Sequence, residues 1–417
     1  MKPAARLQAV IDILTGLSAS NMPADRFIRE FFRARRYAGS KDRASVSERV
    51  FHIYRNRANY AWRMGSEEPR ALVVASLLAE ETSADEIAAL FSGDGYGPAA
   101  LSDAERAAIA NPPAGQPPLC VQGEFPAFLE SELTERFGDN LLPEMQALTY
   151  RAPVDLRVNT LRATRDDVLA RLRSDGFAAE PTTHAPHGIR IPSGEGASQL
   201  SRHKACEEGL FEFQDEAAQI AAILCDVTPG LRVLDIAAGS GGKSLALAAA
   251  MQNTGSIVAS DISAARLKQI GPRAARAGAT IIHTHEHPRG EFDRVLVDAP
   301  CSGSGTWRRQ PEQKWRLTEQ RLGELHALQD ELLDKASAHV APGGRLIYAT
   351  CSLLPSENDR RIAAFLDRTP GFAVISVSTV WREQTGAKPP PGMDEFFRAS
   401  PYATGTDGFF TAVLARA

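Results

Sequence analysis

Hydrophobic and polar residues recur at two different spacings along this chain, and the change of spacing divides it. Between residues 5 and 110 the apolar positions recur every three or four residues, as in LQAVIDIL, DRFIREFFRAR and ALVVASLLAE. This period is typical of amphipathic helices. The run RASVSERVFHIYRNRANYAW predicts a further helix, with Ser45 and Ser47 near the expected N-cap. The proline-rich segment NPPAGQPP (111–118) ends the helical region and is interpreted as a linker.

A shorter region of mixed pattern follows, at about residues 120–205. EFPAFLESELTERFG predicts a helix entered after Pro126, and VDLRVNTLR alternates as a strand does. TRDDVLARLRSDGF predicts a helix capped by Thr164 and ended at Gly176, and HGIRIPSG predicts a return strand. We therefore expect a small sheet with helices, of β-α-β character.

From about residue 209 short apolar runs alternate with helical segments. RVLDIA, SIVASDI, TIIHTH, DRVLVDAP and GRLIYATC are β-branched runs, and FAVISVS and DGFFTAVLARA supply two more strands. Such alternation predicts a parallel, doubly wound sheet with ligands at the carboxyl ends of its strands. The fold class expected is multi-domain, with an all-α domain (1–115), a small α+β lead-in subdomain (120–208) and an α/β Rossmann-like catalytic domain (209–417).

Composition excludes several classes of protein. The 417 residues are 43% hydrophobic and 24% charged, as in soluble globular proteins. No window approaches the roughly 20 apolar residues of a membrane span, and the N-terminus lacks the features of a secretory signal. The five cysteines fit neither a disulfide framework nor a zinc site. We expect a cytoplasmic monomer with no metal, and we interpret His283, His285 and His287 as a surface strand end.

Positive charge is concentrated near the N-terminus although the net charge is −4. Residues 26–63 hold eleven Lys or Arg against three acidic residues. A local basic surface of this kind favours nucleic-acid phosphates, so Arg33, Arg35 and Arg36 are candidate RNA contacts. The aromatic residues interleaved with them are interpreted as core.

A glycine-rich turn follows the first strand of the expected catalytic domain, in VLDIAAGSGGKS. A P-loop would need glycine where the chain has Ala237, and the Rossmann spacing fails because Ser244 stands where its third glycine should be. Asp261 ends the second strand, where a doubly wound fold places an acid that binds ribose. The pattern favours S-adenosylmethionine, which needs an adenosine cradle and no phosphate cradle.

Two of the cysteines, Cys301 and Cys351, each follow a predicted strand. Either one alone is most simply a buried thiol, but both lie at strand exits beside a cofactor loop. Methylation of cytosine at C5 needs a thiolate that adds to C6, and a carboxylate such as Asp298 suits the N3 side of the base. Cysteine-dependent cytosine methylation is therefore the leading hypothesis.

DAPCSGSGTWRRQPEQKW and YATCSLLPSEN together resemble the paired motifs of the RNA cytosine-5 methyltransferases of the NOL1/NOP2/Sun family. GLFEFQDEAAQ, VLDIAAGSGGK and DGFFTAVLARA are also similar to motifs of that family, and KDRASVSERVFHIYRN resembles a NusB-like RNA-binding helical domain. The resemblance implies a class I methyltransferase fold that uses S-adenosylmethionine. It also implies formation of 5-methylcytosine in RNA, and the NusB-like segment points to the bacterial type that modifies small-subunit (16S) ribosomal RNA.

The resemblance further implies roles for individual residues. Cys351 would attack C6 and Cys301 would assist release of the product. Asp261 would hold the ribose, and Asp298 would lie by the methionine end of the cofactor or by the base. The cofactor would be lined by Ala237, Ala238, Gly239, Ser240, Gly241, Gly242 and Lys243.

Two features depart from the family pattern. The usual Cys-Ala-Ala-Pro-Gly-Gly-Lys reads Ala-Ala-Gly-Ser-Gly-Gly-Lys here, which keeps Gly241, Gly242 and Lys243 but loses a rigid proline. The acid often found after the third strand is not evident in IIHTHEHPRGEF, where Glu286 is a weak substitute.

The segment TWRRQPEQKW (306–315) combines positive charges with tryptophans. Arg308, Arg309 and Lys314 are candidate RNA contacts, and Trp307 and Trp315 are assigned to packing. The alternative to an RNA methyltransferase is a catalytically inactive RNA-binding assembly factor of the same fold, supported by the altered glycine loop. A P-loop ATPase is a distant third.

Overall fold

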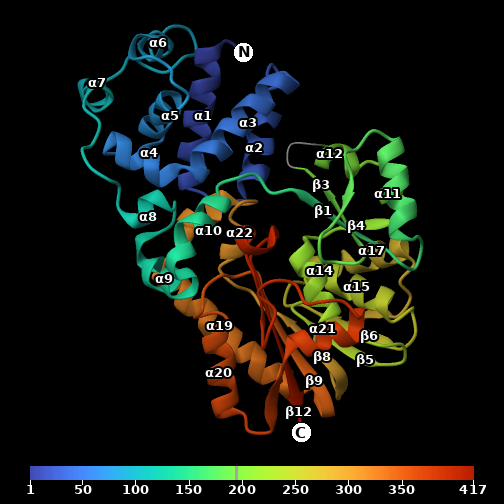
Figure 1. Ribbon diagram of the computed structural model, residues 1–417. Helices are drawn as coiled ribbons and strands as arrows, with labels where there is room; N and C mark the ends of the chain where they lie inside the picture. The colour runs from blue at the N-terminus through green and yellow to red at the C-terminus, as the bar shows by residue number, and fades with distance from the viewer. Residues whose placement is uncertain (193–195) are drawn as a thin grey trace. The chain divides into compact units, whose positions relative to one another are not determined.

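The computed structural model describes residues 1–192 and 196–417 (Figure 1). These residues form two compact units. One unit consists of residues 1–150 together with 307–317, and the other of residues 151–306 and 318–417. This division groups the chain differently from the three expected domains, whose boundaries stay a prediction.

The first unit is helical, as the spacing of its apolar residues predicted. Its core buries Val10, Ile13, Val50 and Val73. Its helices are α1 (Pro3–Ser18), α2 (Ala24–Arg33), α3 (Ser40–Arg55), α4 (Arg57–Met64), α5 (Pro69–Leu78), α6 (Ala84–Leu90), α7 (Asp103–Ala110), α8 (Leu119–Gln122), η1 (Ala127–Leu129), α9 (Glu130–Phe137), η2 (Gly138–Asn140), α10 (Leu141–Ala147) and α18 (Pro311–Arg316).

The N-cap expected at Ser45 or Ser47 is wrong. Helix α3 begins at Ser40, so both serines lie inside it. The side chain of Asp42 accepts a hydrogen bond from the Gly39 N–H at 3.3 Å, and this contact starts the helix earlier than the serines suggested.

The second unit begins with a four-stranded sheet of order β2-β3-β1-β4. Its elements are β1 (Val154–Val158), α11 (Arg165–Ser174), β2 (Glu180–Pro181), β3 (Gly188–Ile191), α12 (Ala197–Leu200), α13 (Lys204–Glu207) and β4 (Phe211–Phe213). Thr164 caps α11 by accepting the Asp167 N–H at 3.2 Å, as predicted. All the strand pairs are antiparallel, unlike those of a β-α-β unit. Of the predicted strand HGIRIPSG, Ser193 and Gly194 lie outside the described residues.

An eight-stranded sheet forms the centre of the second unit, with order β10-β12-β9-β8-β5-β6-β7 and β11 paired to β12. Its strands are β5 (Arg232–Ile236), β6 (Ser256–Ser260), β7 (Ile282–Thr284), β8 (Phe292–Asp298), β9 (Val340–Thr350), β10 (Phe372–Ile375), β11 (Phe397–Ala399) and β12 (Phe409–Arg416). Strands β5 to β9 pair in parallel, as predicted. The prediction of a wholly parallel sheet is wrong at one edge, because β12 runs antiparallel between β9 and β10.

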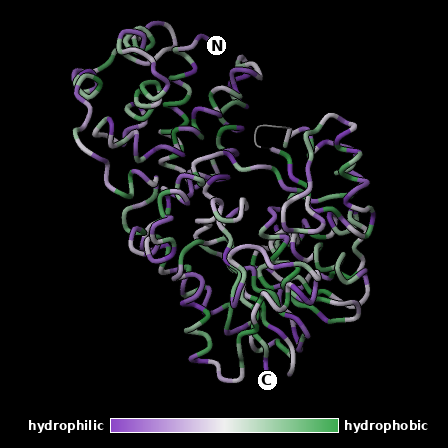
Figure 2. The backbone as a smooth tube through the Cα atoms, viewed as in Figure 1, coloured by the Kyte–Doolittle hydropathy of each residue, from purple (hydrophilic) through white to green (hydrophobic). Residues whose placement is uncertain are grey.

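Helices cover both faces of this sheet (Figure 1). The helices are α14 (Glu216–Ile223), α15 (Gly242–Ala250), α16 (Ala264–Leu267), α17 (Ile270–Ala277), α19 (Glu319–Ser337), α20 (Asp359–Arg368), α21 (Val377–Thr385) and α22 (Pro401–Thr404), with the 3-10 turn η3 (Ser304–Thr306). Alternate residues of β8 divide between two cores: Leu296 packs with α14, α15 and α21, whereas Val295 and Val297 pack with α19 and α20. Hydrophobic stretches accordingly run along the strands (Figure 2).

Candidate active site

Cys301 and Cys351 meet at one edge of the large sheet. Cys301 follows β8 and Cys351 follows β9, and these two strands are parallel neighbours. Their carboxyl ends therefore lie side by side. The two Sγ atoms are 3.4 Å apart and both residues are half-buried. The structure thus brings together the two thiols that the sequence placed at strand exits.

One buried carboxylate holds the loops that carry these cysteines. Glu357 is fully buried. One of its oxygens accepts the Ser302 N–H at 2.8 Å and the Gln329 amide at 3.0 Å, and the other accepts the hydroxyls of Ser302 and Ser352, each at 2.5 Å. Ser302 and Ser352 directly follow the two cysteines, so Glu357 fixes the distance between the thiols. The sequence analysis assigned no role to Glu357, although it lies in the quoted motif YATCSLLPSEN.

The segment before β12 packs against the same loops. The Gly408 N–H donates to the Gly305 carbonyl at 2.9 Å, and the Gly305 N–H donates to the Cys351 carbonyl at 3.0 Å. A Cβ atom on Gly305 would lie 2.1 Å from the Gly408 carbonyl oxygen, so only glycine fits. This contact explains why the motif DGFF accompanies the cysteine motifs.

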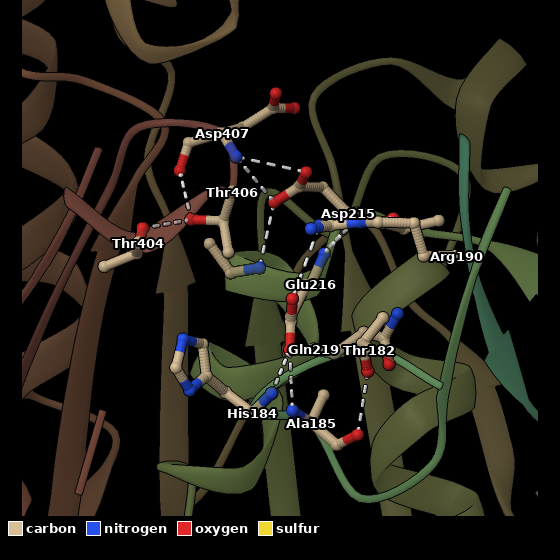
Figure 3. Close-up of polar contacts among 12 residues, drawn as sticks. Thr182, His184, Ala185, Arg190, Asp215, Glu216, Gln219, Thr404, Thr406 and Asp407 are labelled. Atoms are coloured by element: carbon tan, nitrogen blue, oxygen red, sulfur yellow. Dashed lines mark hydrogen bonds and ion pairs between the residues drawn. The ribbon is translucent and has the colours of Figure 1, made fainter. Parts of the chain in front are cut away.

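A second motif of the resemblance holds that segment in place (Figure 3). Both carboxylate oxygens of Asp215 lie within hydrogen-bond distance of the Asp407 N–H, at 3.1 and 3.2 Å, and one also caps α14 by accepting the Ala217 N–H. The neighbouring Glu216 accepts the N–H groups of His184 and Ala185 and pairs with Arg190. The motif FQDEAAQ therefore supports the active-site edge through the backbone of residue 407.

Positive charge lies beside the thiols. Lys243 Nζ is 2.7 Å from a carboxylate oxygen of Asp298 and 5.1 Å from the ring centre of Phe409. Burial opposes the charge of Lys243, yet its pKa is raised, because Asp298 and, more weakly, Asp235 and Cys351 attract the ammonium. Lys243 thus places a positive charge near Cys351.

Cys301 is the thiol that keeps its proton. Its pKa is raised well above the ordinary value by the hydrogen bond with Cys351 and by burial, and the charge of Glu357 adds to the effect. A protonated Cys301 can donate a hydrogen bond to the Cys351 sulfur. The two cysteines therefore have different electrostatic surroundings, as their different predicted roles require.

The glycine loop joins β5 to α15 in an unusual backbone conformation. Ala237, Gly239 and Gly241 have φ of 60°, 58° and 83°, a region that costs a residue with a Cβ about 1–2 kcal/mol. The Ala238 N–H donates to the Ser260 carbonyl, and the Gly239 N–H donates to Asp261, both at 2.9 Å. The loop is thus held at the carboxyl end of the neighbouring strand β6.

Asp261 lies where the sequence placed it but is already engaged. It is 6% exposed, and its second oxygen accepts the Ser263 N–H at 2.7 Å. A carboxylate has about four lone-pair sites, so two remain for a further donor. Its contact with a ribose stays a prediction.

A further acid close to the loop was missed by the sequence analysis. Asp235, in β5, is fully buried, and burial raises its pKa to about 7. Its Oδ2 accepts the Ser244 hydroxyl at 2.5 Å, and its Oδ1 has no hydrogen-bond partner among the described residues. Nothing in the sequence distinguishes it from an acid at the exposed end of a strand.

The basic residues predicted to contact RNA divide by exposure. Arg33 and Arg36 are exposed, whereas Arg35 is half-buried with its guanidinium 3.6 Å from the ring centre of Phe31. Tyr37 departs from the expected core role of the aromatic residues, being 73% exposed.

The segment 307–317 packs within the first unit. Trp315 donates its indole N–H to the Tyr54 carbonyl at 2.8 Å, as its predicted packing role requires. Lys314 is 1% exposed, with its ammonium 5.0 Å from the ring centre of Trp315, and burial lowers its pKa to about 8. The buried ammonium of Lys314 cannot reach a phosphate unless the side chain moves away from Trp315. The RNA roles of Arg308 and Arg309 stay predictions.

Other predicted features concern metals and membranes. His283, His285 and His287 are exposed, as the surface strand end predicted. Within residues 1–192 and 196–417, no cluster of His, Cys, Asp or Glu has the arrangement of a metal site. No helix in those ranges is both long and apolar enough to cross a membrane.

Solved structures share this architecture. The crystal structure of PH0851 is 26% identical and covers 99% of both chains, with a TM-score of 0.77. A methyltransferase homologue from Pyrococcus horikoshii is 26% identical, covers 72% of this chain and 97% of its own length, and has a TM-score of 0.60.

Curated relatives share the sequence. The ribosomal RNA small subunit methyltransferase B of Citrobacter koseri is 33% identical over 297 residues, which is 69% of this chain and 66% of that protein. The protein of the same name from Cronobacter sakazakii is 34% identical over 278 residues, 65% of this chain and 61% of its own length. The matched region thus spans 66% and 61% of these two relatives, less than two thirds of their length.

Two family models match successive parts of the chain. Residues 125–195 match the ferredoxin-like domain of RsmF/B-like methyltransferases, and residues 222–415 match the 16S rRNA methyltransferase RsmB/F. The second range contains the glycine loop, both cysteines and Glu357. Residues 125–195 and 222–415 therefore form the two domains of the RsmB/F family of rRNA methyltransferases, in agreement with the NOL1/NOP2/Sun resemblance of the cysteine motifs.

Proposed function

We propose that this protein is an S-adenosylmethionine-dependent RNA methyltransferase that forms 5-methylcytosine in the 16S RNA of the small ribosomal subunit. The observation that carries the proposal is the 3.4 Å approach of the Cys301 and Cys351 sulfurs beside the Lys243–Asp298 pair. Cytosine C5 methylation is a reaction that needs a nucleophilic thiol at the rim of a cofactor site.

The residues of the loop fit S-adenosylmethionine. A Cβ atom on Gly239 or Gly242 would meet nothing within 4 Å, so there is open space beside the loop. Beyond the ends of β6 and β7 lies a hollow of about 220 Å³ lined by Ala264, Leu267, Lys268, Thr284, His285 and Glu286. The loop Ala237–Lys243 and Asp261 would hold the cofactor, which supplies an electrophilic methyl group.

The chemistry assigned to this chain is carried by the two thiols. Cys351, reacting as a thiolate, forms a bond to C6 of the cytosine, and C5 becomes nucleophilic enough to take the methyl group. The proton on C5 is then lost to a base, and the bond between C6 and the Cys351 sulfur breaks. Cys301 donates a hydrogen bond to the departing sulfur and so favours its expulsion as a thiolate.

Asp298 is assigned to the N3 side of the base. Its carboxylate is partly exposed at the end of β8, with a side-chain exposure of 36%, and Lys243 holds it in place. An acid there can share a proton with N3 as charge develops on the pyrimidine. The assignment stays a proposal.

The alternative of an inactive assembly factor rests on the altered glycine loop. The loop keeps left-handed glycines at 239 and 241 and the hydrogen bond to Asp261, which supports a working cofactor site. A P-loop ATPase is disfavoured because Lys243 is paired with Asp298 and is not directed at a phosphate cradle.

The partner we propose is ribosomal RNA, with the helical first unit as its NusB-like binding domain. Exposed Arg33 and Arg36 support this assignment. The composition and the cysteine pattern of the sequence are the grounds on which we propose a cytoplasmic monomer without a metal.

The test is transfer of labelled methyl groups to ribosomal RNA from cells that lack this gene. We expect label in 5-methylcytidine after digestion of the RNA, and no label with RNA from cells that carry the gene. Binding of S-adenosylhomocysteine without transfer to free RNA or to small-subunit particles would instead support the inactive alternative.

A further inference from the structure

The glycine loop has lost a rigid residue that its family resemblance would supply. Aligned on Gly241, Gly242 and Lys243, the usual proline falls at Ser240. Proline fixes φ near −65° and reduces the conformational freedom of its neighbours. A loop with left-handed residues at 237, 239 and 241 and a serine at 240 has more freedom to lose when it binds a ligand.

Ser240 is held from outside the loop by Arg273 of α17. One guanidinium nitrogen, Nη1, donates to the Ser240 carbonyl at 2.6 Å and lies 2.7 Å from its hydroxyl oxygen. The other, Nη2, donates to Glu212 of β4 at 2.7 Å. The rigid, planar guanidinium therefore joins the loop to the small sheet of the second unit.

Glu212 holds the arginine in place. Its side chain is 7% exposed, and its second oxygen pairs with Arg276. Burial opposes its charge, but the hydrogen bonds and charges of Arg273 and Arg276 outweigh burial, and the pKa of Glu212 is lowered. The carboxylate is thus charged and fixed at neutral pH.

The small sheet reaches the loop at a second point. Arg157, in β1, donates from Nη1 to the Gly242 carbonyl at 2.8 Å. Strand β1 of that sheet therefore contacts the loop directly, whereas β4 acts on the loop through Arg273. The conformation of the glycine loop therefore depends on residues far away in the sequence. A proline at position 240 would instead restrict the loop from within.

We propose that Arg273, fixed by Glu212, is a positioning residue that sets the loop for S-adenosylmethionine and takes the place of the missing proline. The inference rests on the proposed cofactor. It assigns to the small sheet a part in cofactor binding, in addition to its place in the fold. Binding energy that would be spent on ordering the loop is then available for the ligand.

The experiment compares Arg273→Met with Arg276→Ala. Both variants remove one arginine from Glu212, but Arg276 binds Glu212 and, among the described residues, makes no hydrogen bond to the loop. Calorimetry with S-adenosylhomocysteine should show affinity falling about tenfold or more for Arg273→Met, from the loss of charge-assisted hydrogen bonds. The fall should be under about threefold for Arg276→Ala.

Rescue distinguishes positioning from general stability. Adding Ser240→Pro to Arg273→Met should restore affinity to within about threefold of the unchanged protein, since proline orders the loop without the arginine. Amide hydrogen exchange of residues 237–242, measured without ligand, should rise in Arg273→Met and fall again in the double variant.

Several results would overturn the inference. They are unchanged affinity and exchange in Arg273→Met, equal losses in Arg273→Met and Arg276→Ala, and a double variant that orders the loop without regaining affinity. If the unchanged protein itself binds no S-adenosylhomocysteine, the proposed cofactor fails. The hydrogen-exchange measurement still tests whether Arg273 orders the loop in that case, because it needs no ligand.

Discussion

The sulfur atoms of Cys301 and Cys351 lie 3.4 Å apart, although 50 residues separate them in the chain. The charged side chains near the two sulfurs have opposite signs. Lys243 carries its positive charge near Cys351, and Glu357 adds negative charge near Cys301. Cys301 therefore keeps its proton beside the Cys351 sulfur.

Glu357 should matter for geometry more than for charge. Glu357→Ala leaves Ser302 and Ser352 without their shared acceptor, and loss of such buried hydrogen bonds costs about 2–4 kcal/mol of unfolding free energy. We expect methyl transfer to fall about 100-fold while S-adenosylhomocysteine affinity is unchanged. Glu357→Gln should keep most of the activity, because serine hydroxyls can accept as well as donate. Unaltered transfer by Glu357→Ala at normal stability would contradict this role.

Asp235 should give the protein a distinctive dependence on pH. Its pKa is raised to about 7 by burial, against about 4 when unfolded. Between these values the unfolded carboxyl is ionised while the folded one stays protonated, so the folded state binds more protons. The unfolding free energy then falls as pH rises from about 4 to about 7, and this contribution is constant above 7.

Asp235→Asn removes this titration. The variant should gain stability relative to the unchanged protein as pH rises through that window, by a few kcal/mol at most. Denaturant unfolding of both proteins at intervals from pH 4 to pH 8 measures the difference. A difference that does not change with pH would show that Asp235 ionises normally.

Arg33 and Arg36 should contribute to RNA affinity through phosphates. Replacing both with Gln should weaken binding and reduce the slope of log affinity against log salt by up to about two, at nearly one unit per phosphate contact. Arg26 and Arg29 are the control, since they lie on α2 with Arg33 but pair with Glu30 and Asp25. Equal changes of slope in both double variants would assign the effect to net charge alone.

Lys314 should behave as a structural residue. Glu124, buried in the same unit, is the acid whose charge opposes the lowering of the Lys314 pKa. Lys314→Met should lower the unfolding free energy, because it removes the partner of a buried carboxylate, and leave the salt dependence of RNA binding unchanged. A smaller salt slope in this variant would return Lys314 to the RNA-contacting role predicted from the sequence.

Local patterns predicted the elements well, because each depends on neighbouring residues. Thr164 capped its helix as expected, and Cys301 and Cys351 lie at strand exits. The antiparallel β12 was missed because strand order depends on contacts between distant segments. Strand β10 follows β9 and α20 as a parallel unit would, but β12 occupies the place between β9 and β10.

The supporting residues of the site were missed for the same reason. Glu357 binds the nearby Ser352 but also reaches Ser302 across 55 residues, and Arg273 reaches Ser240 across 33. Glu212 lies 61 residues from the arginine that it fixes, and no spacing rule connects such residues. Lys314 was assigned to the surface because lysine is rarely buried unless paired. Its acidic neighbour Glu124 lies 190 residues earlier in the chain.

The account depends most on the different roles of the two cysteines, and denaturing electrophoresis of protein mixed with RNA and S-adenosylmethionine tests them directly. Cys351→Ala should give neither methylation nor a covalent adduct, since it lacks the nucleophile. Cys301→Ala should attack C6 and then stall, so a protein–RNA species that survives denaturation should accumulate. Both half-buried side chains lose only one sulfur atom, so thermal unfolding should show both variants folded. An adduct trapped by Cys351→Ala and absent in Cys301→Ala would contradict the account.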